Sequence, residues 1–139
     1  QNIKNSFLVL NGDTFLDIGL FKTGMRSQVQ SLLLVEVPDA SRYGRVVFDD
    51  KNKITSFEEK DVTFKGKAWI YSGLSHLGPD EFLAVKKETF SLEQDTFGAL
   101  SKSGNLKAVC QKGFFIDIGI PEDLQKFQIL AQQNGLHTI

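Results

Sequence analysis

Two aspartates stand directly after short apolar segments and could hold a metal ion if the fold brings them together. Asp13 follows Phe7–Leu10, and Gly12 beside it allows the backbone to approach a ligand closely. Asp117 follows Gly113–Ile116. Two carboxylates at neighbouring strand ends suit Mg²⁺, which takes one or two carboxylates in addition to substrate phosphates. Taken singly, each aspartate is more simply explained as a turn or capping residue.

A second group of charged side chains ends another β-prone segment, in the sequence Phe57-Glu58-Glu59-Lys60. A carboxylate here could accept hydrogen bonds from sugar hydroxyls, and the ammonium of Lys60 could neutralise a phosphate. Further upstream, Gly44 in Arg42-Tyr43-Gly44 could let a ligand lie against the backbone. A solvated strand end and a plain turn are the simpler alternatives for these two segments.

Two histidines and one cysteine are weaker candidates. His76 and His137 have no partners at metal-ligand spacing, and nothing near Cys110 would lower the pKa of a thiol. The sequence also has no nucleophile elbow, no zinc-ligand cluster and no phosphate-cradling glycine loop. These residues therefore predict core or surface positions rather than catalysis.

The candidate residues depend on short apolar runs for their positions. Residues 6–10 and 31–37 are apolar on both faces and predict buried strands of a largely parallel sheet. A polar turn at residues 49–53 separates two β-prone segments, 45–48 and 54–57, and predicts a β-hairpin. We expect further strands at 69–77, 107–110 and 113–118. We also expect three helices: one that begins at Pro79, one that spans 91–100 and is ended by Gly104, and one that runs from Pro121 to Gly135.

The composition is that of an ordinary globular protein. The 139 residues, of which 41% are hydrophobic and 24% charged, predict a single unit spanning residues 1–139, with 12 phenylalanines for its core. A net charge of −1 argues against a nucleic-acid partner, and the absence of a long apolar run argues against a membrane-bound protein. The single cysteine favours the reducing cytoplasm. The alternation of predicted strands and helices indicates an α/β fold.

Read in order, several segments resemble the sugar-phosphate nucleotidyltransferase family. They are FLVLNGDT at 7–14, RYG at 42–44, SFEEK at 56–60, SG at 72–73, FSLE at 90–93 and GFFIDIGIPED at 113–123. Within the family, the chain most resembles bacterial guanylyltransferases that act on D-glycero-D-manno-heptose 1-phosphate or mannose 1-phosphate. The resemblance covers nearly the whole chain. It implies a Rossmann-like, GT-A-like fold with a mixed, mainly parallel sheet flanked by helices.

The resemblance implies transfer of a nucleoside monophosphate from an NTP to a sugar 1-phosphate, with release of pyrophosphate. GTP with heptose or mannose 1-phosphate is the expected pair, which would supply a GDP-sugar for lipopolysaccharide or capsule; UTP, dTTP and CTP remain open. Asp13 and Asp117 would hold Mg²⁺, and with Lys60 they form the implied catalytic set. The implied substrate-binding residues are Gly12, Tyr43, Gly44, Glu59, Lys60, Ser72 and Gly73.

Three departures from the family pattern bear on these expectations. Asp61 stands where the family usually has proline, and Tyr71 stands where many members have an asparagine that contacts the sugar. The glycine-rich G-G-x-G-T-R-L loop should lie upstream of Gln1. We therefore expect a C-terminal part of the enzyme that lacks the first strands of the sheet and is inactive by itself.

Two further expectations follow from this interpretation. The exposed sheet edge could pair with another copy of the chain and form a homo-oligomer. The alternative to an enzyme is a non-catalytic, nucleotidyltransferase-like module for binding or assembly. The joint presence of Asp13, Asp117 and Lys60 favours the enzyme, since a binding module has no evident need for all three.

Overall fold

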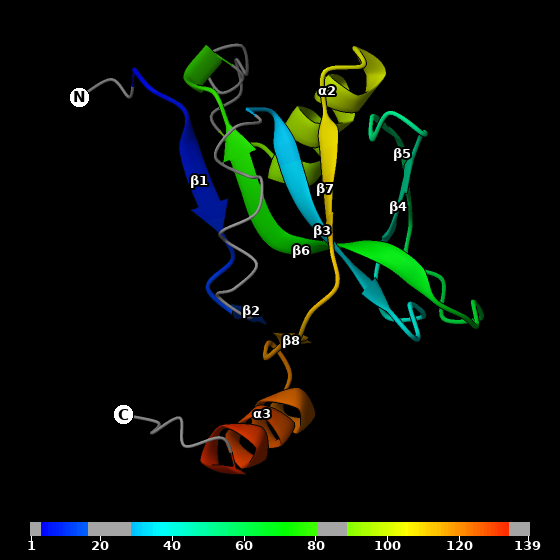
Figure 1. Cartoon of the computed structure of the whole chain (residues 1–139), viewed down its shortest axis with the longest axis vertical. Coiled ribbons are helices and arrows are strands. Elements are labelled where there is room, and N and C mark those ends of the chain that lie inside the picture. The colour runs from blue at the N-terminus through cyan, green and yellow to red at the C-terminus, as the bar shows by residue number, and fades with distance from the viewer. Residues whose placement is uncertain (1–3, 17–28, 81–88, 134–139) are drawn as a thin grey trace.

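The computed structural model describes residues 4–16, 29–80 and 89–133 (Figure 1). The strands are β1 (Phe7–Leu10), β2 (Thr14–Leu16), β3 (Ser31–Val37), β4 (Arg45–Phe48), β5 (Ile54–Glu58), β6 (Ala68–Leu77), β7 (Lys107–Gln111) and β8 (Phe115–Asp117). The helices are η3 (Leu92–Phe97), which has π-type hydrogen bonding, α2 (Gly98–Lys102) and α3 (Pro121–Gln133).

A six-stranded sheet is organised around the long strand β6. Its order is β5-β4-β6-β3-β7, and β1 also pairs with β6. Strand β3 occupies one edge of β6, from Ala68 to His76. The other edge is shared, because β4 pairs with it at Ile70 and β1 pairs with it from Leu74 to Leu77. Strands β2 and β8 form a separate two-stranded antiparallel sheet.

The predicted mixed sheet with flanking helices is confirmed, but its expected predominance of parallel pairs does not hold in the described residues. There, parallel pairing is confined to β3 and β7, and β1, β3 and β4 pair with β6 in antiparallel register. The predicted hairpin at 45–48 and 54–57 is confirmed as β4 and β5. Short connections such as this hairpin favour antiparallel neighbours, since a parallel pair requires a long crossover.

The prediction that residues 6–10 form a strand buried on both faces of a parallel sheet is wrong. β1 is antiparallel to β6, and its residues alternate between half-buried and exposed. Leu8 and Leu10 are 45% and 52% exposed, because none of the described elements covers the face on which they lie. An apolar run shows that both faces can be buried, but the surrounding elements decide whether they are.

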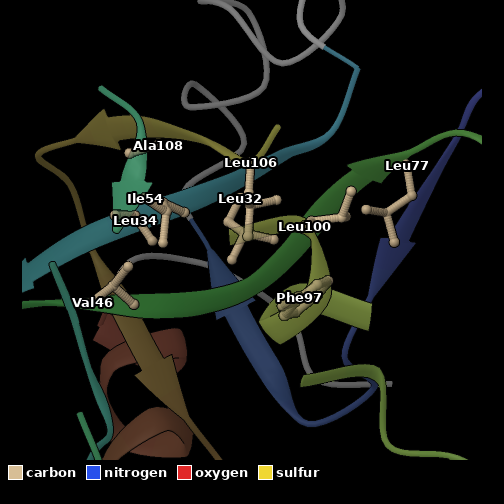
Figure 2. Packing of buried hydrophobic residues seen from close by; sticks show 9 residues of the cluster. All are labelled: Leu32, Leu34, Val46, Ile54, Leu77, Phe97, Leu100, Leu106 and Ala108. Carbon is tan, nitrogen blue, oxygen red and sulfur yellow. The ribbon is translucent and has the colours of Figure 1, made fainter. Parts of the chain in front are cut away.

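The main hydrophobic core lies between the sheet and the helical segment η3–α2. Leu32 and Leu34 of β3 point into this core, and Leu33 and Val35 belong to clusters on the opposite face of the sheet. Figure 2 shows the nine residues of the main cluster, which are Leu32, Leu34, Val46, Ile54, Leu77, Phe97, Leu100, Leu106 and Ala108. Full burial of each such leucine contributes about 1.5–3 kcal/mol, so the core holds β3 and β6 firmly in register.

The ends of the helices follow the predicted signals. Ser91 caps η3, and its Oγ accepts a hydrogen bond of 3.2 Å from the Gln94 N–H. Gly104 ends the α2 region with a left-handed φ of +71°, which glycine adopts without steric cost. Helix α3 begins at Pro121, as predicted, whereas Gly135 lies outside the described residues. None of the helices in the described ranges has both the length and the apolar character needed to cross a membrane.

The other predicted elements are confirmed where the structure describes them. Strands at 69–77, 107–110 and 113–118 correspond to β6, β7 and the shorter β8. The helix expected to begin at Pro79 does begin there, and its continuation beyond Asp80 lies outside the described residues.

Candidate active site

A cleft of about 750 Å³ opens at a break in the pairing of β6. Between Ile70, the partner of β4, and Leu74, the first partner of β1, this edge of β6 has no strand partner among the described residues. Asn11 bridges part of the break, because its N–H donates a 2.9 Å hydrogen bond to the Gly73 carbonyl. The lining includes most of the predicted site residues: Asp13, Tyr43, Gly44, Glu59, Ser72, Gly73 and Asp117.

Strands β2 and β8 bring the two predicted aspartates together at one side of this cleft. Thr14 is opposite Asp117 in the ladder, and the Ile118 N–H donates a 2.8 Å hydrogen bond to the Asp13 carbonyl. A Cβ added at Gly119 would lie 3.0 Å from Asp117 Oδ1 and 3.2 Å from Asp13 Oδ2. Both carboxylates therefore face the same small space, which stays open because residue 119 has no side chain.

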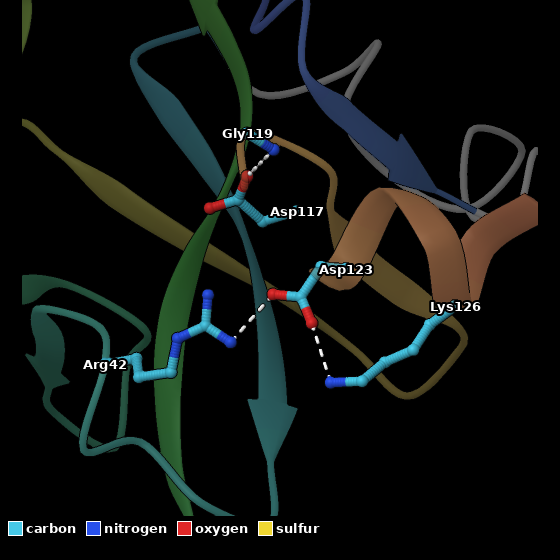
Figure 3. Close-up of polar contacts among 5 residues, drawn as sticks. All are labelled: Arg42, Asp117, Gly119, Asp123 and Lys126. Atoms are coloured by element: carbon cyan, nitrogen blue, oxygen red, sulfur yellow. Dashed lines mark hydrogen bonds and ion pairs between the residues drawn. The ribbon is translucent and has the colours of Figure 1, made fainter. Parts of the chain in front are cut away.

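The donor set at this point fits a magnesium ion. Two carboxylates are available, and no group of three or more His, Cys, Asp or Glu side chains able to hold a metal occurs among residues 4–16, 29–80 and 89–133. Mg²⁺ is usually held by one or two carboxylates while water and substrate phosphates complete its shell. Asp117 Oδ1 also accepts a 2.9 Å hydrogen bond from the Gly119 N–H, which fixes the carboxylate (Figure 3).

Gly73 brings β6 close to the segment that carries Asp13. Its φ of +85° is a left-handed conformation, and an added Cβ would lie 3.0 Å from both Asn11 Cβ and Thr14 Oγ1. A glycine is therefore required here by contacts within the protein itself. At Gly44, an added Cβ would lie 3.3 Å from the Glu58 carbonyl oxygen, so this glycine lets the loop approach the end of β5.

Two predicted residues lie away from the cleft lining. Lys60 is exposed beyond the end of β5, next to Glu59, and its side chain does not line the cleft. Gly12 is exposed, and an added Cβ would have no atom within 4 Å. Lys60 and Gly12 are neighbours in sequence of cleft-lining residues, but neither of them lines the cleft itself.

Two of the three departures from the family pattern, at Asp61 and Tyr71, have different structural consequences. Asp61 closes a turn, since its Oδ1 accepts hydrogen bonds from the Thr63 hydroxyl and N–H, and these bonds lower its pKa. Tyr71 lines the cleft, with its ring edge-to-face against Phe97 at 5.3 Å between centroids. Burial raises the pKa of Tyr71 to about 12.

Beside Tyr71, the Ser72 side chain is fully buried in the cleft wall. Its Oγ has no hydrogen-bond partner among the described residues. A buried hydroxyl without a partner costs about 1–3 kcal/mol.

An ion-pair network at the cleft rim was not predicted. Asp123, in the first turn of α3, pairs with Arg42 Nη1 at 2.7 Å and with Lys126 Nζ at 2.9 Å (Figure 3). Hydrogen bonds from Lys126 and Arg42 lower the pKa of Asp123 against the opposing effect of burial. The acidic first turn predicted only a helix start, because the sequence alone does not show which cation comes near.

Helical residues on the opposite wall of the cleft were also missed. Glu93, Gln94 and Lys102 of the η3–α2 segment line it together with residues 55–57 of β5. Stretches of π-helix are rare and are frequent at functional sites. The family motif FSLE at 90–93 was the only sequence feature that pointed to this segment, and it did not show that the helix faces the cleft.

Two of the remaining candidates, His76 and Cys110, lie outside the cleft lining. His76 is buried in β6, and Cys110 is half-buried in β7 with its pKa raised by burial. Both placements agree with the predicted core or surface positions. His137 lies outside the described residues.

Comparisons with known proteins agree with this architecture. Residues 1–134 match the nucleotidyl transferase family profile. The chain is 38% identical over 131 residues to the D-glycero-alpha-D-manno-heptose 1-phosphate guanylyltransferase of Campylobacter jejuni, covering 91% of this chain and 57% of that protein. It is 30% identical over 123 residues to the mannose-1-phosphate guanyltransferase of Aspergillus oryzae, covering 84% of this chain and 34% of that protein.

A solved structure has the same fold. The crystal structure of HddC from Yersinia pseudotuberculosis superposes with a TM-score of 0.73 at 35% identity, covering 88% of this chain and 53% of that one. The same protein has also been solved in complex with GMP-PN, with a TM-score of 0.72. The chain thus spans about half the length, or less, of the relatives it matches. The predicted fold class and resemblance are confirmed, and this chain is a member of the nucleotidyltransferase family.

Proposed function

We propose that the protein transfers a nucleotidyl group from an NTP, with GTP as the first candidate, to heptose 1-phosphate or mannose 1-phosphate and releases pyrophosphate. The observation that carries this proposal is the pair of carboxylates that face one open space beside the cleft. The names of the relatives support guanylyl transfer to these two sugar phosphates, and the GMP-PN complex of HddC supports a guanine nucleotide.

In this proposal Asp13 and Asp117 hold Mg²⁺, which when bound neutralises charge on phosphoryl oxygens during in-line attack. The protein's own groups orient the acceptor. Glu59 at the cleft wall accepts hydrogen bonds from sugar hydroxyls, and the ring of Tyr71 forms part of the same wall. Positioning of this kind lowers the barrier because the reacting groups no longer have to be ordered in the transition state.

Three further parts of the proposal depend on the resemblance. Lys60 neutralises the sugar phosphate from the segment beside Glu59. The product is a GDP-sugar for surface glycans, made in the cytoplasm. Strand β1, which pairs only with β6 among the described residues, also pairs with a second copy of the chain.

The decisive experiment is a pyrophosphate-release assay on the gene product that contains this chain. GTP, CTP, UTP and dTTP are offered with Mg²⁺ against heptose, mannose and glucose 1-phosphate. We expect release with GTP and one of the first two sugars. Asp13→Ala should abolish it, and the matched control Asp50→Ala, at an exposed turn position outside the cleft lining, should leave it unchanged.

The result also separates the enzyme from the alternative of a non-catalytic module. No release with any pair, together with no Mg²⁺-dependent binding of a sugar 1-phosphate, would contradict the proposal. Binding without release would favour the module. Release that survives Asp13→Ala would show that the carboxylate pair is not the centre of the reaction.

A further inference from the structure

Arg42 is a cation at the cleft that the mechanism above does not use. Its Nη1 pairs with Asp123 at 2.7 Å, yet 45% of its side chain is exposed and the residue lines the cleft. A guanidinium carries five N–H donors in a planar fork. The ion pair therefore leaves donors free to meet a second anion, and the fork suits a phosphate.

Asp123 fixes the direction of that guanidinium. Its side chain is only 7% exposed and pairs with two cations, Arg42 and Lys126. A buried carboxylate that loses its partners is costly, so the paired arrangement is strongly preferred. Lys126 lies one turn further along α3 and serves as the second partner.

The same contact joins the two segments that carry the site. Arg42 precedes Tyr43, whose ring packs edge-to-face on Phe115 of β8 at 5.9 Å between centroids. Phe115 is two residues from Asp117 on the same strand, and Asp123 follows in the first turn of α3. The ion pair therefore ties the loop at 42–44 to the strand that presents a proposed metal ligand, and it holds a positive charge near that ligand.

We propose that Arg42 contacts the phosphate group of the ligand in the cleft and that Asp123 is the positioning residue that holds Arg42 in place. The inference rests on the proposed function for the identity of that ligand, a sugar 1-phosphate. Arg42 contacts the phosphate directly because it lines the cleft, whereas Lys60 lies outside the lining and acts on the phosphate only as a more distant positive charge. Arg42 here is a ligand-contacting group, and Asp123 acts only through it.

The test measures, by isothermal titration calorimetry with Mg²⁺ present, the Kd of mannose 1-phosphate and of inorganic pyrophosphate. The variants, made in the gene product that contains this chain, are Arg42→Gln, Arg42→Lys, Asp123→Asn and the double variant Arg42→Gln with Asp123→Asn. Lys67→Gln is the matched control, because Lys67 also pairs with a carboxylate, Glu36 at 3.3 Å, and neither residue lines the cleft.

We expect Arg42→Gln to weaken anion binding about tenfold or more, the scale of a lost charge-assisted hydrogen bond. Asp123→Asn should weaken it by a smaller factor, Arg42→Lys should restore part of the loss, and Lys67→Gln should change nothing. If Asp123 acts through Arg42, adding Asp123→Asn to Arg42→Gln has little further effect on affinity. That non-additivity distinguishes positioning from a purely structural ion pair.

Four outcomes would decide against the proposal or limit it to part of its claim. Unchanged anion affinity in Arg42→Gln would overturn it, and a lower Tm in Asp123→Asn with normal affinity would assign the pair to stability alone. Arg42-dependent binding of pyrophosphate without binding of mannose 1-phosphate would support the phosphate contact while the proposed acceptor fails. Binding of neither probe by the unmodified protein would overturn the inference.

Discussion

Substitution of alanine for Gly119 is the sharpest test of the carboxylate pair. The new Cβ would lie 3.0 Å from Asp117 Oδ1 and 3.2 Å from Asp13 Oδ2. The backbone of Gly119 does not have a left-handed φ, so alanine fits there without backbone strain. The methyl group therefore acts mainly on the two oxygens, which must each move by several tenths of an ångström.

That displacement matters because Mg²⁺ requires oxygen ligands close to 2.0–2.1 Å in near-octahedral geometry. Disturbing the surroundings of a metal ligand typically weakens metal binding 10- to 100-fold. For Gly119→Ala we therefore expect Mg²⁺ binding weaker by about 1.4–2.8 kcal/mol. The stability of the fold should change by less than about 0.5 kcal/mol, as for other surface substitutions, since residue 119 is exposed.

The assay pairs calorimetric titration with Mg²⁺ and urea unfolding of the same samples. Gly98→Ala is the control, because its added Cβ would lie 3.8 Å from the Glu93 carbonyl, an ordinary contact, and residue 98 is in α2. The control should bind Mg²⁺ normally and be slightly more stable, since alanine favours a helix over glycine by about 0.5–1 kcal/mol. Unchanged Mg²⁺ affinity in Gly119→Ala would refute the reasoning that the open space beside this glycine is the metal site.

Three further predictions concern stability. Gly73→Ala should lower the free energy of unfolding, measured with urea, by at least about 1–2 kcal/mol. The reasons are the φ of +85° at Gly73 and the contacts of an added Cβ with Asn11 and Thr14. An unchanged free energy of unfolding would contradict the close packing there. Ser72→Ala should raise or preserve the Tm of the ligand-free protein, since a buried hydroxyl without a partner is lost, and a clear drop in Tm would count against this. The pKa of Asp123 lies below its usual 3.8, so its ion pairs stabilise the fold above that value and the benefit is lost as the pH falls through the folded-state pKa. Unfolding free energies between about pH 5 and pH 2 should therefore fall less steeply for Asp123→Asn than for the unmodified protein.

Local sequence determined most of the secondary structure. The run at 31–37 is apolar from Leu32 to Val35, and it became strand β3, an interior strand of the sheet, with Leu32–Val35 buried. Ser91 and Pro121 mark helix starts because a hydroxyl can cap free N–H groups and proline needs no N–H partner in a first turn. The ordered motifs also indicated the family, since their residue types and succession are properties of the chain alone.

Tertiary structure decided which of these residues meet. Asp13 and Asp117 are far apart in sequence and come together only because β2 pairs with β8. The contact between Arg42 and Asp123 likewise depends on where α3 lies after β8, which no local pattern encodes. The burial of β1 depends on what covers each of its faces. The position of Lys60 outside the cleft lining depends on the course of the chain after β5. Side-chain types and turn signals act over a few residues, whereas these outcomes are set by contacts between distant segments, whose geometry exists only once the sheet has formed.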